Sequence, residues 1–155
     1  MKIDWKTLIL AVLLCQSIGI AGSVFTTPAI PTWYASLNKP SFTPPGSVIG
    51  AVWIILYFLM AIALYLVQVS KNKQKGIATK VFGVQLFLNL LWSVLFFGLK
   101  SPIYGLIGII ILWFAVLLTI VKFYKISKTA AYLMIPYILW VSFASFLNYL
   151  IFILN

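Results

Sequence analysis

Trp33-Tyr34-Ala35-Ser36-Leu37-Asn38-Lys39-Pro40-Ser41-Phe42-Thr43-Pro44-Pro45 is the segment that separates the first two apolar runs of the chain. Connections between membrane helices are usually short and polar. This one is long and rich in aromatic residues and proline, which predicts that it packs against the rest of the protein. A packed loop above a helical bundle is a candidate lid over a ligand site.

The chain contains five long apolar runs, one before this loop and four after it. About 20 helical residues cross a hydrocarbon core of about 30 Å, and each run is long enough. The runs lack the strict alternation of membrane barrel strands, and backbone groups in lipid must be hydrogen bonded within their own segment. The sequence therefore predicts an all-α membrane protein, a bundle of five transmembrane helices forming a single domain over residues 1–155. The predicted spans are Trp5–Phe25, Pro44–Val69, Ile77–Leu99, Pro102–Phe123 and Thr129–Leu154.

The composition agrees with a membrane protein. Of the 155 residues, 64% are hydrophobic and only 8% are charged, whereas about a quarter of the residues in a soluble domain are charged. Most of the surface must therefore face lipid.

The net charge of +10 comes from lysines, and their positions argue against a nucleic-acid partner. Nine lie at the N-terminus and in the second and fourth connections: Lys2, Lys6, Lys71, Lys73, Lys75, Lys80, Lys122, Lys125 and Lys128. Only Lys39 and Lys100 lie on the opposite side. This positive-inside pattern predicts a plasma-membrane protein with a cytoplasmic N-terminus, an extracytoplasmic C-terminus and an extracytoplasmic first loop. Lysine as the only basic residue, together with many Ile, Phe and Asn residues, indicates a bacterial source. The lysine-rich face would contact anionic membrane lipid.

Proline and hydroxyl residues predict the helix boundaries. The first connection is expected to begin at Thr26, with a short helix starting at Pro31 and ending at Asn38-Lys39-Pro40. Thr43 is predicted to cap the second span, and Ser101 the fourth. Pro136, inside the fifth span, predicts a kink. The kink has two open interpretations, plain helix curvature or a shaped cavity wall.

Three spans each carry aromatic and polar residues at helical spacing, and polar residues in a membrane tend to face the bundle interior. They are Trp53 and Tyr57 on the second, Gln85, Asn89, Trp92, Ser93 and Phe96 on the third, and Trp140, Ser142, Ala144, Ser145 and Asn148 on the fifth. The alternative interpretation is that these polar residues serve helix–helix contact. It is the favoured one when Gln85 is considered by itself. Three such faces below an aromatic loop favour a pocket. Trp113 has only apolar neighbours in sequence and is predicted to face lipid or core.

Several residue types are absent, and this limits the chemistry. The only acid is Asp4, there is no histidine, and Cys15 is the only cysteine. Ordinary general acid–base catalysis therefore lacks its usual groups. No metal site and no cofactor are predicted. A proton-coupled transporter would need a carboxylate within a span.

Three blocks of this sequence resemble one family. The first is Trp33-Tyr34, Leu37, Lys39-Pro40 and Pro44-Pro45, followed by Trp53 and Leu56-Tyr57. The second is Gln85-Leu86, Leu88-Asn89, Trp92-Ser93 and Phe96-Phe97. The third is Pro136-Tyr137, Trp140, Phe143-Ala144 and Leu147-Asn148. Together they resemble the tryptophan-rich sensory protein, or translocator protein (TspO, peripheral benzodiazepine receptor), family over nearly the whole chain.

This resemblance implies a five-helix bundle with a ligand pocket under the first loop, commonly in a homodimer. It implies binding of porphyrins such as protoporphyrin IX, and of the drug PK11195. It also implies, for some bacterial members, light-dependent degradation of protoporphyrin IX by pocket tryptophans, which here would be Trp53 and Trp140. The basic residue of the proposed cholesterol motif is absent after Tyr149. Small-residue pairs at Gly19 and Ser23, or at Gly46 and Gly50, are alternative dimer surfaces.

The leading hypothesis is a receptor-like protein that binds protoporphyrin IX or another hydrophobic small molecule within the bundle. The predicted ligand-binding residues are Tyr34, Pro40, Trp53, Tyr57, Asn89, Trp92, Phe96, Trp140, Ala144 and Asn148, with Trp33 as a further cover. Lys39 is interpreted either as a partner of a propionate or as an ordinary loop charge. The alternatives are a light- and oxygen-dependent porphyrin-degrading enzyme that uses Trp53 and Trp140, and a porphyrin or lipid transporter.

Overall fold

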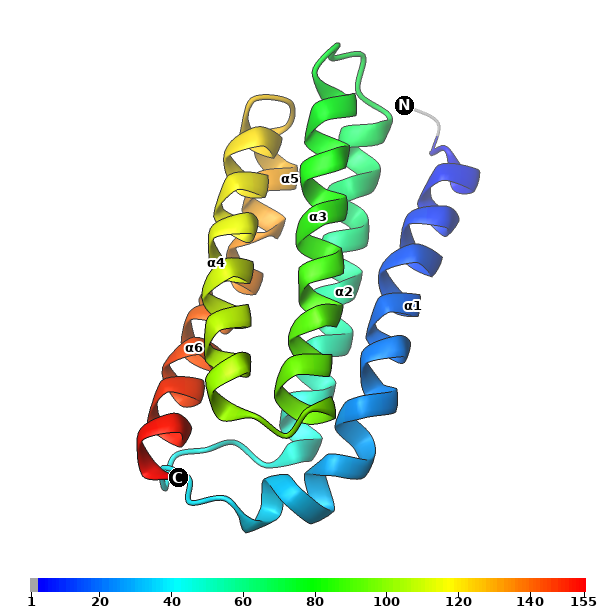
Figure 1. The fold of residues 1–155 in the computed structure, drawn as a ribbon. Coiled ribbons are helices and arrows are strands. Elements are labelled where there is room, and N and C mark those ends of the chain that lie inside the picture. Colours follow the sequence, from blue (N-terminus) through cyan, green and yellow to red (C-terminus); the bar gives the residue numbers. More distant parts are fainter. Residues whose placement is uncertain (1–2) are drawn as a thin grey trace.

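The computed structural model describes residues 3–155, in which five helices long and apolar enough to cross a membrane form one bundle (Figure 1). The elements are α1 (Trp5–Ala29), η1 (Ile30–Tyr34), α2 (Gly46–Gln68), α3 (Lys75–Ser93), η2 (Val94–Gly98), α4 (Pro102–Tyr124), α5 (Lys128–Leu133) and α6 (Ile135–Leu154). Both η segments are π-helical turns, and the described residues form no strand. The predicted all-α bundle of five spans is confirmed.

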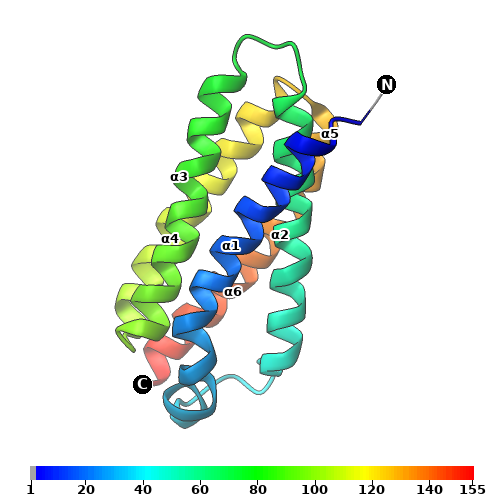
Figure 2. The same ribbon diagram turned by 90° about the vertical axis from the view of Figure 1, so that its right-hand side faces the viewer.

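The spans run up and down, so that the two chain ends lie at opposite ends of the bundle (Figure 1). Helix α3 packs on α4, α4 packs on α6, and α1 packs on α2. Near the N-terminal end α1 crosses α2, where the Asp4 backbone N–H donates to the Tyr65 hydroxyl at 3.2 Å. In the view of Figure 2 the two helices overlap near the N-terminal end and lie apart at the opposite end, which we call the loop end.

The lysines separate between the two ends as the sequence predicts. Lys6 and the connections after α2 and α4 lie at the N-terminal end, whereas Lys39 and Lys100 lie at the loop end (Figure 1). Lys2 lies outside the described residues. Which end faces the cytoplasm stays a prediction.

The N-terminus of α1 is capped by the only acid of the chain. The Asp4 carboxylate accepts hydrogen bonds from the Thr7 backbone N–H at 3.2 Å and from the Thr7 hydroxyl at 2.7 Å. These bonds stabilise the charged carboxylate and hold the pKa of Asp4 below its usual value. Asp4 therefore stays ionised at neutral pH and complements the positive end of the helix dipole.

The start of the first connection differs from the prediction. No separate helix begins at Pro31; α1 instead continues through Pro28 into η1 and ends near Ser36. Pro28 and Pro31 lack backbone N–H groups, and a wider π turn lets the helix continue past them. The Thr32 hydroxyl donates to the Pro28 carbonyl oxygen at 2.8 Å across this turn. The connection is therefore shorter than predicted.

The predicted cap of the second span is wrong. Helix α2 begins at Gly46 with Pro45 at its N-cap, and no side chain caps it. The Thr43 hydroxyl instead donates to the Pro40 carbonyl oxygen at 2.7 Å and closes a turn within the loop. A hydroxyl that can bond its own neighbouring backbone competes for the capping role.

The predicted cap at Ser101 is confirmed, and the fifth span is interrupted close to Pro136, where the sequence predicts a kink. The Ser101 hydroxyl accepts from the Tyr104 N–H at 3.4 Å, with Pro102 in the first turn of α4. The fifth span is interrupted at Met134, where α5 ends and α6 begins, and Pro136 lies in the first turn of α6. The missing N–H of Pro136 explains why the fifth span divides there.

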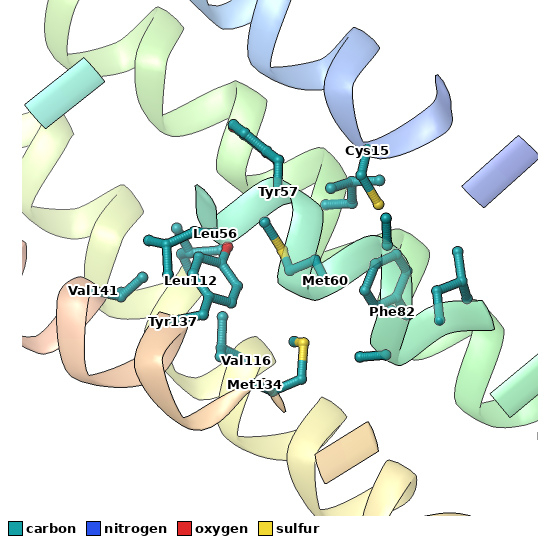
Figure 3. Close-up of a cluster of buried hydrophobic side chains, with 14 of the residues drawn as sticks. Cys15, Leu56, Tyr57, Met60, Phe82, Leu112, Val116, Met134, Tyr137 and Val141 are labelled. Carbon is teal, nitrogen blue, oxygen red and sulfur yellow. The ribbon is translucent and has the colours of Figure 1, made fainter. Parts of the chain in front are cut away.

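The bundle core is a continuous cluster of buried side chains at the centre of the spans (Figure 3). Met60, Phe82, Leu112, Met134 and Tyr137 are each at most 1% exposed. Figure 3 shows that they converge from α2, α3, α4 and the fifth span, with Cys15 of α1 beside them. This core closes one end of the cavity described below.

We expect glycines at two positions on neighbouring spans to respond oppositely to alanine. A Cβ at Gly105 would lie 2.4 Å from Phe96 Cδ2, and Phe96 is buried, so Gly105→Ala should destabilise the bundle by about 1–3 kcal/mol. A Cβ at Gly83 meets no atom within 4 Å, so Gly83→Ala should stabilise helix α3 by about 0.5–1 kcal/mol. Unfolding in mixed detergent micelles measures both. Equal effects of the two substitutions would contradict the packing described for Gly105.

Candidate functional site: an aromatic cavity at the loop end

A cavity of about 530 Å³ occupies the interior of the bundle between its middle and the loop end. Its walls come from α1, α2, α3, α6 and the two π-helical turns, whereas α4 and α5 contribute no lining residue. Small-molecule sites commonly have volumes of about 300–1,000 Å³ and apolar walls with a few polar groups. The cavity therefore has the size and character of a ligand site.

Nine of the ten predicted ligand-binding residues line this one cavity: Tyr34, Trp53, Tyr57, Asn89, Trp92, Phe96, Trp140, Ala144 and Asn148. Pro40 is not among the lining residues; it lies in the loop, where its carbonyl oxygen accepts from Thr43. Trp33 lies behind the lining and packs edge-on against Phe96, with ring centroids 5.3 Å apart. The helix faces predicted from the sequence therefore meet in one cavity. Their contact with a ligand stays a prediction.

The end of the cavity nearer the bundle centre is a buried chain of hydrogen bonds. The Tyr57 hydroxyl donates to Asn89 Oδ1, and Asn89 Nδ2 donates to the Tyr137 hydroxyl at 2.8 Å. The Tyr137 hydroxyl donates in turn to Gln85 Oε1 at 3.0 Å. Gln85 Nε2 lies 3.8 Å from the Met60 sulfur. The chain ties α2, α3 and α6 together, so Asn89 has a structural role as well as a place in the cavity wall.

One wall of the cavity is a set of tryptophans. The Trp92 indole N–H donates to Asn148 Oδ1 at 3.0 Å and fixes α3 against α6. The Trp92 ring stacks on Phe96 at 5.8 Å and 10°. Trp53 lies 6.0 Å from Trp92 and 5.8 Å from Tyr57, centroid to centroid. A flat aromatic ligand would find rings suited to stacking on this wall.

The cavity is covered at the loop end by two π-helical turns that meet face to face. Tyr34 of η1 packs on Phe96 and Phe97 of η2, with centroids 6.2 and 5.7 Å apart. We call these residues, together with Trp33 and the loop that follows them, the roof. Single π turns are uncommon and occur frequently at functional sites.

Lys39 is more than an ordinary loop charge, because its ammonium caps the end of the first helix, and a contact with a propionate stays a prediction. Its ammonium donates to the backbone carbonyl oxygens of Tyr34, Ala35 and Leu37. The nitrogen also lies 4.9 Å from the centroid of the Tyr34 ring. A lysine has three N–H donors, and all three serve the end of the first helix. Lys39 is therefore a helix C-cap that holds the roof, and a propionate would have to compete with it.

Lys39→Met should loosen the roof while the spans stay folded. Loss of a cation at a helix C-terminus weakens local structure by about 1 kcal/mol, which corresponds to about fivefold faster hydrogen exchange over residues 33–39. Exchange followed by mass spectrometry measures this directly. The control is Lys100→Met, which removes the same charge from the same end of the bundle. Similar exchange in the two variants would show that Lys39 acts only through its charge.

A second fastening joins the roof to the end of α6. Asn155 accepts from the Asn38 backbone N–H at 2.9 Å and donates to the Asn38 carbonyl oxygen at 2.9 Å. Asn38 Nδ2 also donates to the Leu154 carbonyl oxygen at 3.3 Å. Phe42 stacks on Phe146 at 6.2 Å and 7°. Figure 1 shows the C-terminus beside the cyan loop.

Sequence reasoning missed the contribution of α1. Gln16, Gly19, Gly22, Ser23 and Thr26 line the cavity. Their small or polar side chains at spacings of three and four are the signal that could have identified them. Gly19 is also not available for contact with a second copy of the chain, because it packs against Tyr57; a Cβ there would lie 2.7 Å from the Tyr57 ring. Tyr137 was missed as a network residue, although it shares a helical stripe with Val141 and Asn148.

Other polar residues of the predicted faces lie outside the cavity. Gln85 is fully buried in the core and contacts Tyr137, which supports helix–helix contact. Ser142 accepts from the Trp113 indole N–H at 2.7 Å, so Trp113 does not have purely apolar surroundings. The Ser145 hydroxyl donates to the Val141 carbonyl oxygen of its own helix at 2.7 Å. Serines in membrane helices often bond their own backbone in this way.

The lining residues carry no charge, and the described residues contain no group of acids, cysteines and histidines suited to a metal. Trp140 lines the cavity, and its indole N–H is buried without a partner among the described residues. Such a donor is costly to leave unpaired. The cavity thus offers an uncharged, largely aromatic surface with one buried donor that is still free.

Comparison with known proteins agrees with this geometry. A model of the TspO/MBR family matches residues 11–154. The chain belongs to the TspO/MBR family. It is 47% identical over 148 residues to the tryptophan-rich protein TspO of Archaeoglobus fulgidus, covering 96% of each chain. It is 43% identical over 151 residues to the protein of that name from Chlorobaculum tepidum, again covering 96% of each.

The TspO/MBR family extends to animals. The chain is 36% identical over 140 residues to the translocator protein of Homo sapiens, covering 88% of this chain and 83% of the human one. The family resemblance noted in the sequence is therefore confirmed. The prediction of a multi-pass membrane protein is confirmed as well.

Proposed function

We propose that this chain is a receptor-like membrane protein that binds protoporphyrin IX or a related hydrophobic planar ligand in the aromatic cavity. The observation that carries the proposal is the cavity itself, about 530 Å³ in volume, with tryptophans from α2, α3 and α6 on its walls. The uncharged lining and the roof of aromatic rings suit an apolar macrocycle.

One polar group of the cavity wall could pair with a porphyrin. The buried, unpartnered Trp140 indole N–H is a donor for a carbonyl, a carboxylate or a ring nitrogen. Because the lining carries no cation, we expect the propionates to lie at the edge of the cavity, where water or lipid headgroups can solvate them.

The test is a titration of the purified protein in detergent with protoporphyrin IX in the dark, followed by tryptophan fluorescence. Saturable quenching is expected, because tryptophans line the cavity. Trp113→Phe is the control, since Trp113 does not line the cavity and bonds Ser142. Quenching that rises linearly with porphyrin, without saturation, would refute the proposed binding.

A second candidate function is light-dependent degradation of the bound porphyrin. Trp53 favours it, because its ring lies near Tyr57, Trp92 and Tyr137, at 5.8, 6.0 and 6.2 Å between centroids. In this reaction the porphyrin absorbs the light and dioxygen is the oxidant, with an indole as an oxidisable neighbour. Under illumination, loss of the porphyrin absorbance that Trp53→Phe or Trp140→Phe abolishes without abolishing binding would support the enzyme. Unchanged absorbance would support the receptor.

A further inference from the structure

We infer that the ligand reaches the cavity from within the bilayer, through an opening between α1 and α2, and that the roof is not the route. The inference rests on the proposed function and deepens it. It names the class of ligand as an amphiphile that dissolves in the membrane before it binds.

The roof is held in place by three sets of contacts. Lys39 holds three backbone carbonyl oxygens. Asn155 exchanges two hydrogen bonds with the backbone of Asn38. Tyr34 packs on the η2 aromatic rings and is only 9% exposed. Passage from the aqueous side would have to break all three together.

The side between α1 and α2 is different, because residues there line the cavity and are also exposed at the bundle surface. Ile20 of α1 is 68% exposed and Ile54 of α2 is 56% exposed. No lining residue of α3 or α6 is exposed to that degree; Asn89 is 1% and Asn148 2% exposed, and Trp140 and Ala144 are half-buried. The cavity therefore meets the surroundings on its α1–α2 side.

Gly50 marks the opening on α2. It lines the cavity one helical turn before Ile54, and a Cβ built there meets no heavy atom within 4 Å. In the view of Figure 2 α1 and α2 lie apart at the loop end. Towards the bundle centre the helices are bridged, because Gln16 Nε2 donates to the Ile54 carbonyl oxygen at 3.4 Å. The opening thus extends from this bridge towards the loop end.

The chemistry of the opening suits a guest that comes from lipid. Ile20, Ile54 and the bare backbone of Gly50 form an apolar edge, and the Ser23 hydroxyl already donates to the Ile20 carbonyl oxygen at 2.6 Å. No charged side chain lines the passage to compensate an ion for lost water. A hydrophobic ring already in the bilayer crosses this edge without being desolvated first.

The test is the rate of protoporphyrin IX association in lipid nanodiscs, followed by stopped-flow fluorescence. Gly50→Trp should obstruct the opening and slow association at least tenfold, whereas Gly83→Trp, on an open site of α3 outside the cavity, should change the rate less than twofold. Asn155→Ala should also change it less than twofold, because the roof is not the route. An unchanged rate in Gly50→Trp, or faster association in Asn155→Ala, would overturn the inference.

A second measurement needs no ligand and separates this inference from the proposed function. A nitroxide is placed at Ala144→Cys in a Cys15→Ala background, and its accessibility is measured by electron paramagnetic resonance in lipid. The lateral opening predicts that the label collides with oxygen dissolved in the bilayer and is shielded from a water-soluble nickel chelate. Access for the chelate, or shielding from both, would overturn the opening even if porphyrin binds. Absence of porphyrin binding with access for oxygen alone would refute only the proposed ligand.

Discussion

Ala144→Phe is expected to weaken protoporphyrin IX binding about 100-fold, which corresponds to about 2.7 kcal/mol. Ala144 lies on the α6 wall of the cavity, one turn after Trp140. A phenylalanine ring there would occupy space that the macrocycle needs, and the ring has room because the cavity is about 530 Å³. The fold should persist, since the new side chain fills a void and displaces no core residue. Fluorescence titration in the dark measures the effect.

The matched control is Ala51→Phe, which makes the same replacement at an exposed position of α2 that does not line the cavity. Its affinity should remain within about twofold of the parent chain. Equal affinities in Ala144→Phe and the parent would mean that the porphyrin binds elsewhere, for example on the lipid-facing surface.

Asn89→Ala is expected to destabilise the bundle by about 2–4 kcal/mol, the largest effect on stability that we predict for a residue of the cavity. The substitution leaves the Tyr57 hydroxyl without its acceptor and removes the amide that donates to the Tyr137 hydroxyl, which keeps only its bond to Gln85. Each buried polar group that loses its partner costs about 1–3 kcal/mol, and values measured in membrane helices lie towards the lower end. Unfolding in mixed detergent micelles measures the loss.

A double-substitution cycle shows whether this loss comes from the hydrogen-bond chain. Tyr137→Phe alone should destabilise by about 1 kcal/mol, and Asn89→Ala together with Tyr137→Phe should cost about 1 kcal/mol less than the sum of the two. Additive effects would mean that the two side chains do not interact in the membrane. The sequence alone predicts Asn89 only as a ligand-binding residue, because it does not reveal that both polar atoms of the amide are engaged within the bundle.

The sequence predicts the spans well because length and hydrophobicity alone decide what crosses a bilayer. It also predicts most of the cavity wall. Trp53, Asn89 and Trp140 lie on amphipathic stripes of separate helices, and such stripes turn inward in lipid. Helical spacing therefore carries the information that brings these faces together.

The roof could not be predicted in the same way. Its geometry depends on a helix that continues past Pro28 and Pro31 through a π turn, whereas proline usually signals a helix boundary. The role of Lys39 depends on carbonyl groups that become available only when that helix ends near it. The Asn38–Asn155 contact joins residues 117 positions apart, and local sequence patterns contain no sign of it.

The small residues of α1 were a missed signal for a related reason. Gly19, paired with Ser23, was interpreted as a candidate for contact between two copies of the chain, yet Gly19 lies against Tyr57 of the same chain. Small residues permit close approach between helices whether the partner helix belongs to the same molecule or to another. A homodimer stays a prediction, and its interface must lie on other residues than Gly19.

The most direct test of the central claim, that the aromatic cavity holds the ligand, is an experimental structure of the protein with protoporphyrin IX in a lipid environment. We predict macrocycle density inside the bundle, bounded by Trp53, Trp92 and Trp140 and covered by Tyr34. Density for the porphyrin on the outer face of the helices or among the lysines of the N-terminal end, with the cavity filled by lipid or water, would contradict this account.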